Sequence, residues 1–62
     1  MTMTGKELLQ LMLKKGWKLI RIDGSHHIIR KGEQIEVIPV HGNKDLPKGL
    51  LNAILKRNGI SI

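Results

Sequence analysis

The sequence predicts a small α+β domain of order α-β-β-β-α, with two helices on one face of a three-stranded antiparallel sheet. Apolar residues recur at helical spacing near both ends of the chain, whereas strand-forming residues fill its middle. Two glycine-containing dipeptides, Asp23-Gly24 and Gly32-Glu33, divide the middle into segments of strand length. With 62 residues, the chain has room for one domain, spanning 1–62.

The first helix is predicted over residues 5–15. Thr4 and Glu7 have the spacing of a capping box, in which each side chain accepts a hydrogen bond from the other's backbone. Gly16 follows two lysines and is suited to the left-handed residue after a helix. One side of this segment is apolar, with Leu8, Leu9, Leu11, Met12 and Leu13.

Three strands are predicted, over 17–22, 26–31 and 34–40. Pro39 lies near the end of the third strand, where a missing backbone donor is tolerated. Both turns between the strands are predicted to have two central residues, which fixes the pairing of the strands.

This pairing predicts where the histidines lie. Arg21 should be opposite His26, and His26 opposite Pro39. His41 would then be a diagonal neighbour on the same face, at about 7–8 Å between backbones. His27 should point to the other face, because strand side chains alternate.

The same alternation divides the apolar side chains into two sets but leaves open which set the helices cover. One set is Trp17, Leu19, Ile28, Ile35 and Val37. The other is Ile20, Ile22, Ile29, Ile38 and Val40. A sheet face without helices would be apolar and partly exposed, which is typical of a surface that binds a partner.

The second helix is predicted to begin near Pro47, which suits a first helical turn, and to end at Asn58-Gly59. Its apolar side contains Leu46, Leu50, Leu51, Ile54 and Leu55. Ile60 can pack against the end of this helix. The complete order of elements is that of the double-stranded RNA-binding domain, an analogy that concerns the fold alone.

Charge indicates a polyanionic partner. Eleven Lys and Arg residues outnumber five acidic residues, giving a net charge of +6. Trp17 is the only aromatic residue, so we do not expect an aromatic platform for stacking bases. The cations expected to bind RNA phosphates, unless they form only a solvated surface, are Lys18, Arg21, Arg30, Lys31, Lys44 and Lys48.

The absence of cysteine excludes disulfides and thiolate metal sites. The apolar runs are too short to span a bilayer, and no apolar signal segment with a cleavage site follows Met1. We therefore expect a soluble cytoplasmic protein.

Histidine is the residue type left for chemistry. The acidic residues are scattered and do not suggest a carboxylate cluster, so no metal and no cofactor are expected. For His27 a structural role is favoured, and for His41 a turn role and a site role are equally compatible with the sequence. His26 is the remaining candidate.

The segment Gly24-Ser25-His26-His27-Ile28-Ile29-Arg30 resembles the Gly-Ser-His segment of the HicA toxins. Further similarity to that family extends over nearly the whole chain. It includes Thr4-Gly5-Lys6-Glu7-Leu8-Leu9, Lys15-Gly16-Trp17, Pro39-Val40-His41-Gly42 and Ile54-Leu55-Lys56-Arg57-Asn58-Gly59-Ile60.

The resemblance implies a double-stranded-RNA-binding-domain-like fold and the activity of a ribosome-independent mRNA interferase. It also implies a HicB-like antitoxin as protein partner and mRNA as substrate. The family's catalytic histidine corresponds to His26. Gly24 and Ser25 would position it, and Arg21 or His41 would support it. A non-catalytic RNA-binding module and a protein-interaction domain are the alternatives.

Overall fold

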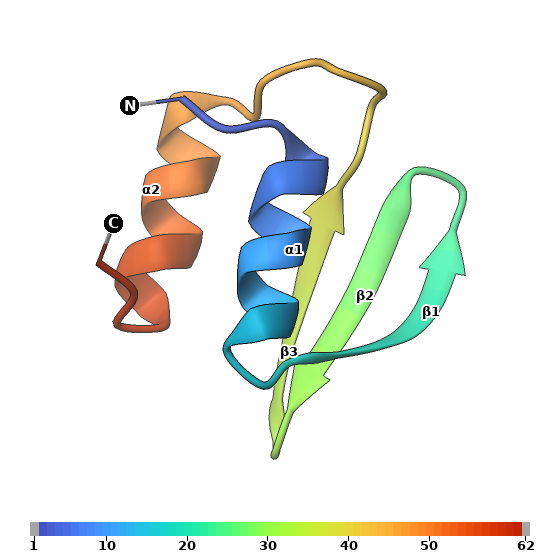
Figure 1. Ribbon diagram of the computed structural model, residues 1–62, viewed down its shortest axis with the longest axis vertical. Helices are drawn as coiled ribbons and strands as arrows, with labels where there is room; N and C mark the ends of the chain where they lie inside the picture. The colour runs from blue at the N-terminus through green and yellow to red at the C-terminus, as the bar shows by residue number, and fades with distance from the viewer. Residues whose placement is uncertain (1, 62) are drawn as a thin grey trace.

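The computed structural model describes residues 2–61 and confirms the predicted order of elements (Figure 1). The sheet has the order β1-β2-β3, and both strand pairs are antiparallel. The elements are α1 (Gly5–Lys14), β1 (Lys18–Asp23), β2 (His26–Lys31), β3 (Gln34–Pro39) and α2 (Lys48–Arg57).

Local capping defines both ends of α1. Thr4 Oγ1 accepts from the Glu7 amide at 3.1 Å, and Glu7 Oε1 accepts from the Thr4 amide at 2.8 Å, which is the predicted capping box. Gly16 has a φ of 100°, so a residue without a Cβ ends the helix in the left-handed region. The helix ends at Lys14, one residue before the predicted end.

The second helix also ends as predicted. Asn58 is its C-terminal cap, and the Ile60 amide donates to the Leu55 carbonyl at 2.9 Å. Ile60 packs against the core, the contact expected after such a cap. At the other end Pro47 is the N-terminal cap and makes no side-chain hydrogen bond. The helix α2 begins at the next residue, Lys48.

Both helices pack on one face of the sheet, which we call the covered face. Ile29 of β2 and Ile38 of β3 lie on it and are completely buried. The largest fully buried side chains come from both helices and from this face: Leu8, Met12, Ile29, Ile38, Leu51 and Ile54. No helix in residues 2–61 is long and apolar enough to cross a membrane.

The predicted register of the first hairpin is wrong by two residues. The turn has Gly24 and Ser25 as its central residues, one position later than predicted, so Asp23 pairs with His26. Gly24 has a φ of 62° at the first central position, where a type II′ turn requires glycine. Arg21 is therefore opposite Ile28 rather than His26. A shift of two residues preserves the alternation, so Arg21 remains on the same face as His26.

A β-bulge at Ile20 changes the face of the residues that precede it. Leu19 pairs with Ile29 and Lys18 with Arg30, which leaves Ile20 as the extra residue. Without the bulge, Leu19 would be opposite Arg30. The predicted grouping of Leu19 with Ile28 is therefore wrong.

Trp17 was also predicted on the side of Ile28 but is buried in the core, with 4% of its surface exposed. The uncovered side, here named the open face, includes Ile28, Ile35 and Val37. Ile28 is half-buried, whereas Ile35 and Val37 are 52% and 44% exposed. Ile22 pairs with His27 and belongs to the covered face, but it is exposed because β1 is an edge strand away from the two helices (Figure 1).

Candidate functional site

His26 is the first residue of β2 and directly follows the Gly24-Ser25 turn. Its side chain is exposed and lies on the open face, between Asp23 of β1 and Pro39 of β3. The pairing with Pro39 is the predicted one. A ligand can therefore approach His26 from the side of the sheet that carries no helix.

His27 lies on the covered face, as alternation predicts. It is half-buried, pairs with Ile38, and its Nδ1 is 3.3 Å from the Ser25 carbonyl oxygen. Adjacent histidines thus occupy different environments: one faces solvent on the open face, whereas the other contacts the turn backbone.

The turn that carries His26 is joined to the chain after β3. The Ser25 carbonyl accepts a hydrogen bond of 2.8 Å from the Val40 amide. On the other side, α1 begins so close to β3 that a Cβ on Gly5 would overlap the Pro39 carbonyl. Sequence reasoning missed this contact, although a glycine at the first position of a helix is a weak indication of close packing.

His41 follows β3 at the end of the sheet where His26 lies. It is exposed, and its carbonyl accepts from the Lys44 amide at 3.1 Å in a turn. The strand was predicted to continue to Val40 but ends at Pro39. The diagonal rule for strand neighbours therefore does not fix the position of the His41 side chain relative to His26.

The six candidate cations fall into different environments. Arg21 is exposed on the open face, and Lys18 and Arg30 form a pair further along it. Lys44 is in the loop after β3, and Lys48 begins α2 at the same end of the molecule (Figure 1).

Lys31 differs from the other five cations. Its ammonium group donates to the Lys15 carbonyl at 2.8 Å, at the C-terminus of α1. A cation there satisfies a free carbonyl and interacts favourably with the helix dipole. Lys31 therefore has a structural contact that the sequence did not reveal.

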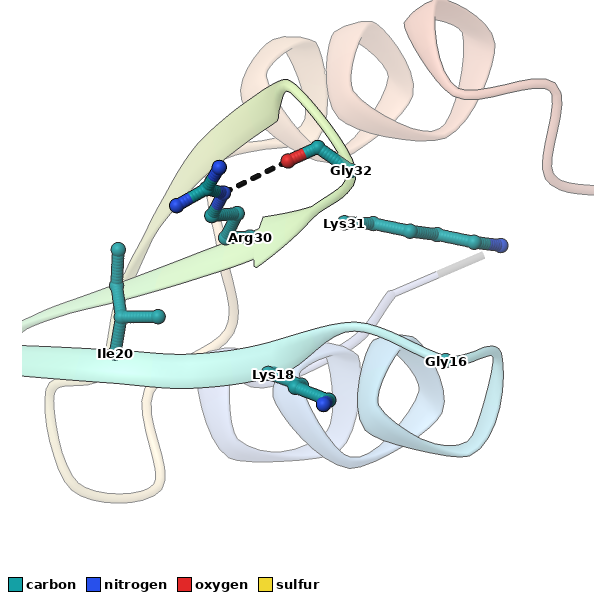
Figure 2. A pocket seen from close by; sticks show the side chains of 6 residues that line it. All are labelled: Gly16, Lys18, Ile20, Arg30, Lys31 and Gly32. Carbon is teal, nitrogen blue, oxygen red and sulfur yellow. Dashed lines mark hydrogen bonds between the residues drawn. The ribbon is translucent and has the colours of Figure 1, made fainter.

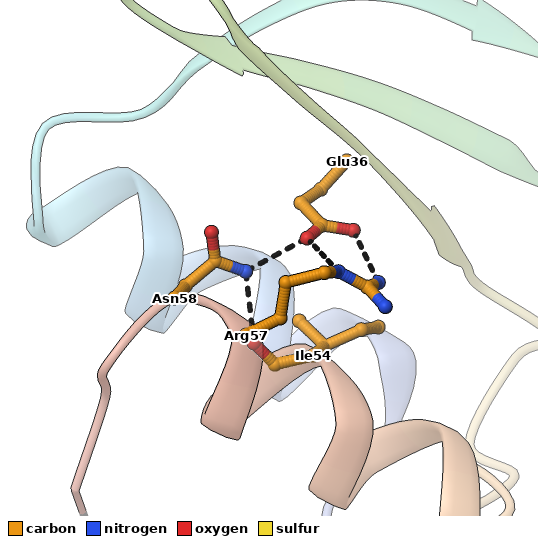
Figure 3. Close-up of polar contacts among 4 residues, drawn as sticks. All are labelled: Glu36, Ile54, Arg57 and Asn58. Atoms are coloured by element: carbon orange, nitrogen blue, oxygen red, sulfur yellow. Dashed lines mark hydrogen bonds and ion pairs between the residues drawn. The ribbon is translucent and has the colours of Figure 1, made fainter.

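A polar cluster on the covered face attaches α2 to β3 (Figure 3). Glu36 is buried, and its carboxylate accepts two bonds of 2.8 Å from the Arg57 guanidinium and one of 2.8 Å from Asn58 Nδ2. The hydrogen bond from Arg57 holds the pKa of the Glu36 carboxyl below its ordinary value, against the opposing effect of burial. No pattern in the sequence predicts this cluster.

Within residues 2–61, no three side chains of His, Cys, Asp or Glu are placed to share a metal ion. The charged side chains nearest to His26 on the open face are those of Asp23, directly opposite it, and Arg21, two positions further along β1.

The family of this chain follows from comparison with known proteins. No curated protein matches the sequence. The sequence model described as the HicA toxin of bacterial toxin-antitoxin systems matches residues 5–60, from the first residue of α1 to the contact that follows α2. This match includes every helix and strand of the fold, and the chain belongs to the HicA toxin family of bacterial toxin–antitoxin systems.

Proposed function

We propose that this toxin is an endoribonuclease whose activity depends on His26. The observation that best supports the proposal is the contrast between the two adjacent histidines. His26 is exposed on the open face, whereas His27 is half-buried on the covered face and contacts the Ser25 carbonyl. Only the first is free to contact an RNA strand lying across the sheet.

The chemistry requires few groups because RNA carries its own nucleophile. In the proposed reaction the 2′-oxygen forms a bond to phosphorus as the bond to the 5′-oxygen breaks. One proton leaves the 2′-hydroxyl, and one proton is delivered to the departing oxygen. Histidine titrates close to neutral pH and serves as base or acid in such a step. His26 would perform one of these transfers, and His41 or water the other.

Positive charge near His26 would stabilise the phosphate as charge develops on it. Arg21 lies on the same face, two strand positions from the residue opposite His26. Lys44 and Lys48 would add to the attraction of RNA from the adjacent loop and helix. Gly24 and Ser25 would act by position, since they form the turn before His26.

A toxin of this kind implies a cognate antitoxin. We propose that the antitoxin covers the open face, where Ile28, Ile35 and Val37 form an apolar area beside His26. Burying that area would provide affinity and would also block RNA from the histidine.

The test compares the parent protein with His26→Ala and His27→Ala in cleavage of a defined RNA. We expect His26→Ala to lower the rate by about 10²- to 10⁴-fold, the usual effect of losing a general acid or base. His27→Ala is the matched control and should retain most activity. Fluorescence of Trp17, the only tryptophan, reports whether each variant is folded.

A folded His26→Ala protein that cleaves at the parental rate would exclude the proposed role. If the parent protein binds RNA but no preparation cleaves it, the non-catalytic binding module is the better description. An inactive, folded His27→Ala protein beside an active His26→Ala protein would assign the role to the other histidine.

A further inference from the structure

A shallow pocket of about 340 Å³ lies at the end of the sheet remote from His26 (Figure 2). Its walls come from β1, from β2 and from the turns on either side of them. The lining residues are Gly16, Lys18, Ile20, Arg30, Lys31 and Gly32. Three of the six are cations and none is acidic. The ammonium group of Lys31 is bound to the Lys15 carbonyl, which leaves Lys18 and Arg30 to contact an anion.

The bulge at Ile20 creates the central feature of this pocket. By adding one residue to β1, it places Lys18 directly opposite Arg30. Like charges on directly opposed strand residues are destabilising. Among residues 2–61, the only cation and carboxylate closer than 4.0 Å are Arg57 and Glu36, so no acidic side chain compensates the pair. A bound anion would remove this unfavourable interaction.

Among these cations, Arg30 presents a guanidinium that is held in place for an anion. Arg30 Nε donates to the Gly32 carbonyl at 2.7 Å, which fixes the guanidinium. Its two terminal nitrogens have no hydrogen-bond partner in the described part of the chain. The ammonium group of Lys18 has none either, and it points away from the Arg30 guanidinium (Figure 2). Two guanidinium N–H groups in a fixed plane match two oxygens of a phosphate.

We propose that the pocket binds a second phosphodiester of the same RNA strand that His26 cleaves. This inference rests on the proposed function and adds a distal binding site to it. Arg30 is four residues after His26 on β2 and lies on the same face, so the two points are about 13 Å apart along the strand. At a rise of about 3.4 Å per nucleotide of one strand, this corresponds to about four nucleotides, and to fewer in an extended strand.

The first experiment measures binding without cleavage. The probe is a 2′-O-methyl RNA, which lacks the nucleophilic hydroxyl and is therefore not cleaved. It is longer than the 27 Å extent of the protein. The pocket variant is Lys18→Gln with Arg30→Gln. The matched control is Lys6→Gln with Lys56→Gln, which removes the same charge from exposed positions on the two helices.

We expect the pocket variant to bind about tenfold more weakly than the control. The slope of log affinity against log salt concentration should be smaller by about 1.4 for the pocket variant than for the control, since each lost contact to a single strand removes about 0.7. In the parent protein, amide NMR signals of Gly16 and Gly32 should shift with the probe. Equal affinities for the pocket and control variants would overturn the proposal.

The second experiment measures cleavage of an RNA shortened stepwise on each side of its cleavage site. On one side only, the KM of the parent protein should rise once the RNA no longer extends to the pocket, with kcat unchanged. The pocket variant should show the high KM at every length. A KM independent of length in the parent protein would contradict a distal site. If the parent does not cleave RNA, the proposed function fails, whereas the binding experiment still decides whether the pocket is an RNA site.

Discussion

Replacing Glu36 by Gln should destabilise the fold measurably, although it only replaces one carboxylate oxygen by an N–H₂ group. The carboxylate accepts three hydrogen bonds, and the side chain is 8% exposed. A Gln amide retains one acceptor oxygen but presents an N–H₂ group toward the donors of Arg57 or Asn58. One or two bonds are therefore lost, and the N–H₂ group of Gln faces another hydrogen-bond donor.

The expected loss is about 1.5–3 kcal/mol, the range for a hydrogen bond to a charged group. We expect a loss near the lower end of this range, because the Arg57 side chain is 57% exposed and water replaces part of the interaction. For a domain of this size, each kcal/mol lowers the Tm by about 4–8 °C.

The effect should depend on pH in a defined direction. The folded-state pKa of Glu36 lies below its ordinary value of 4.5, mainly because of the hydrogen bond from Arg57. The stabilisation is therefore complete above pH 4.5 and is lost as the pH falls through the lower, folded-state pKa. The parent protein and Glu36→Gln should accordingly differ most near neutral pH and converge in acid.

Thermal unfolding followed by Trp17 fluorescence, from neutral pH into acid, measures this difference. Glu33→Gln, at an exposed position in the β2–β3 turn, is the control for loss of one negative charge. Equal stability of Glu36→Gln and Glu33→Gln at neutral pH would refute the reasoning. So would a difference between the parent and Glu36→Gln that persists unchanged in acid.

Three other predictions concern packing, charge and the partner. Gly5→Ala should lower stability by about 1–3 kcal/mol because its Cβ would overlap the Pro39 carbonyl, whereas Gly49→Ala, with no atom within 4 Å of the new Cβ, should be neutral or stabilising in the same unfolding assay. Arg21→Ala should reduce the slope of log RNA affinity against log salt concentration by about 0.7 without changing the Tm. Lys31→Ala should lower the Tm because it removes the contact with α1. Identical behaviour of the two variants in both measurements would argue against separate roles. Co-purification with the product of the neighbouring gene should give a complex that does not cleave RNA, and Val37→Glu should weaken that complex while the toxin stays folded; a stable complex with full cleavage activity would exclude steric inhibition.

The parts of the fold that depend on local chemistry were predictable. The capping box at Thr4, the glycine after α1 and the cap at Asn58 are short-range patterns, and each has the predicted geometry. The β2–β3 register was also predicted, because Gly32-Glu33 connects the strands as a two-residue turn. These features require no knowledge of the remaining structure.

The first hairpin shows where local patterns are insufficient. Asp23-Gly24 and Gly24-Ser25 are both acceptable turns, and the strand pairing beyond them decides between the two. Nothing in the residues near Ile20 distinguishes a bulge from a regular strand, so the faces of Trp17 and Leu19 were assigned wrongly. The placement of Arg21 and His26 on one face survived because the error in register was an even number of residues.

The polar contacts between α2 and the covered face were the least predictable. Glu36 lies between two apolar residues of β3 and resembles an ordinary solvent-facing side chain in the sequence. Its burial follows from the position of α2, whose Arg57 and Asn58 reach it from 21 and 22 residues away. Long-range packing of this kind has no periodic pattern in the sequence.

The bulge in β1 provides a physical link between stability and RNA binding. An exposed edge strand can pair with another chain, and bulges and charged side chains oppose such pairing. The β1 edge has both, with Ile20 as the bulged residue and Lys18, Arg21 and Asp23 among its exposed residues. The same extra residue turns Lys18 toward the open face and places it opposite Arg30. Deleting Ile20 would leave Leu19 opposite Ile29 and Lys18 opposite Arg30 in a regular strand. The edge would then pair more easily with another chain while the pair of cations remained, so this deletion separates protection of the edge from the anion site.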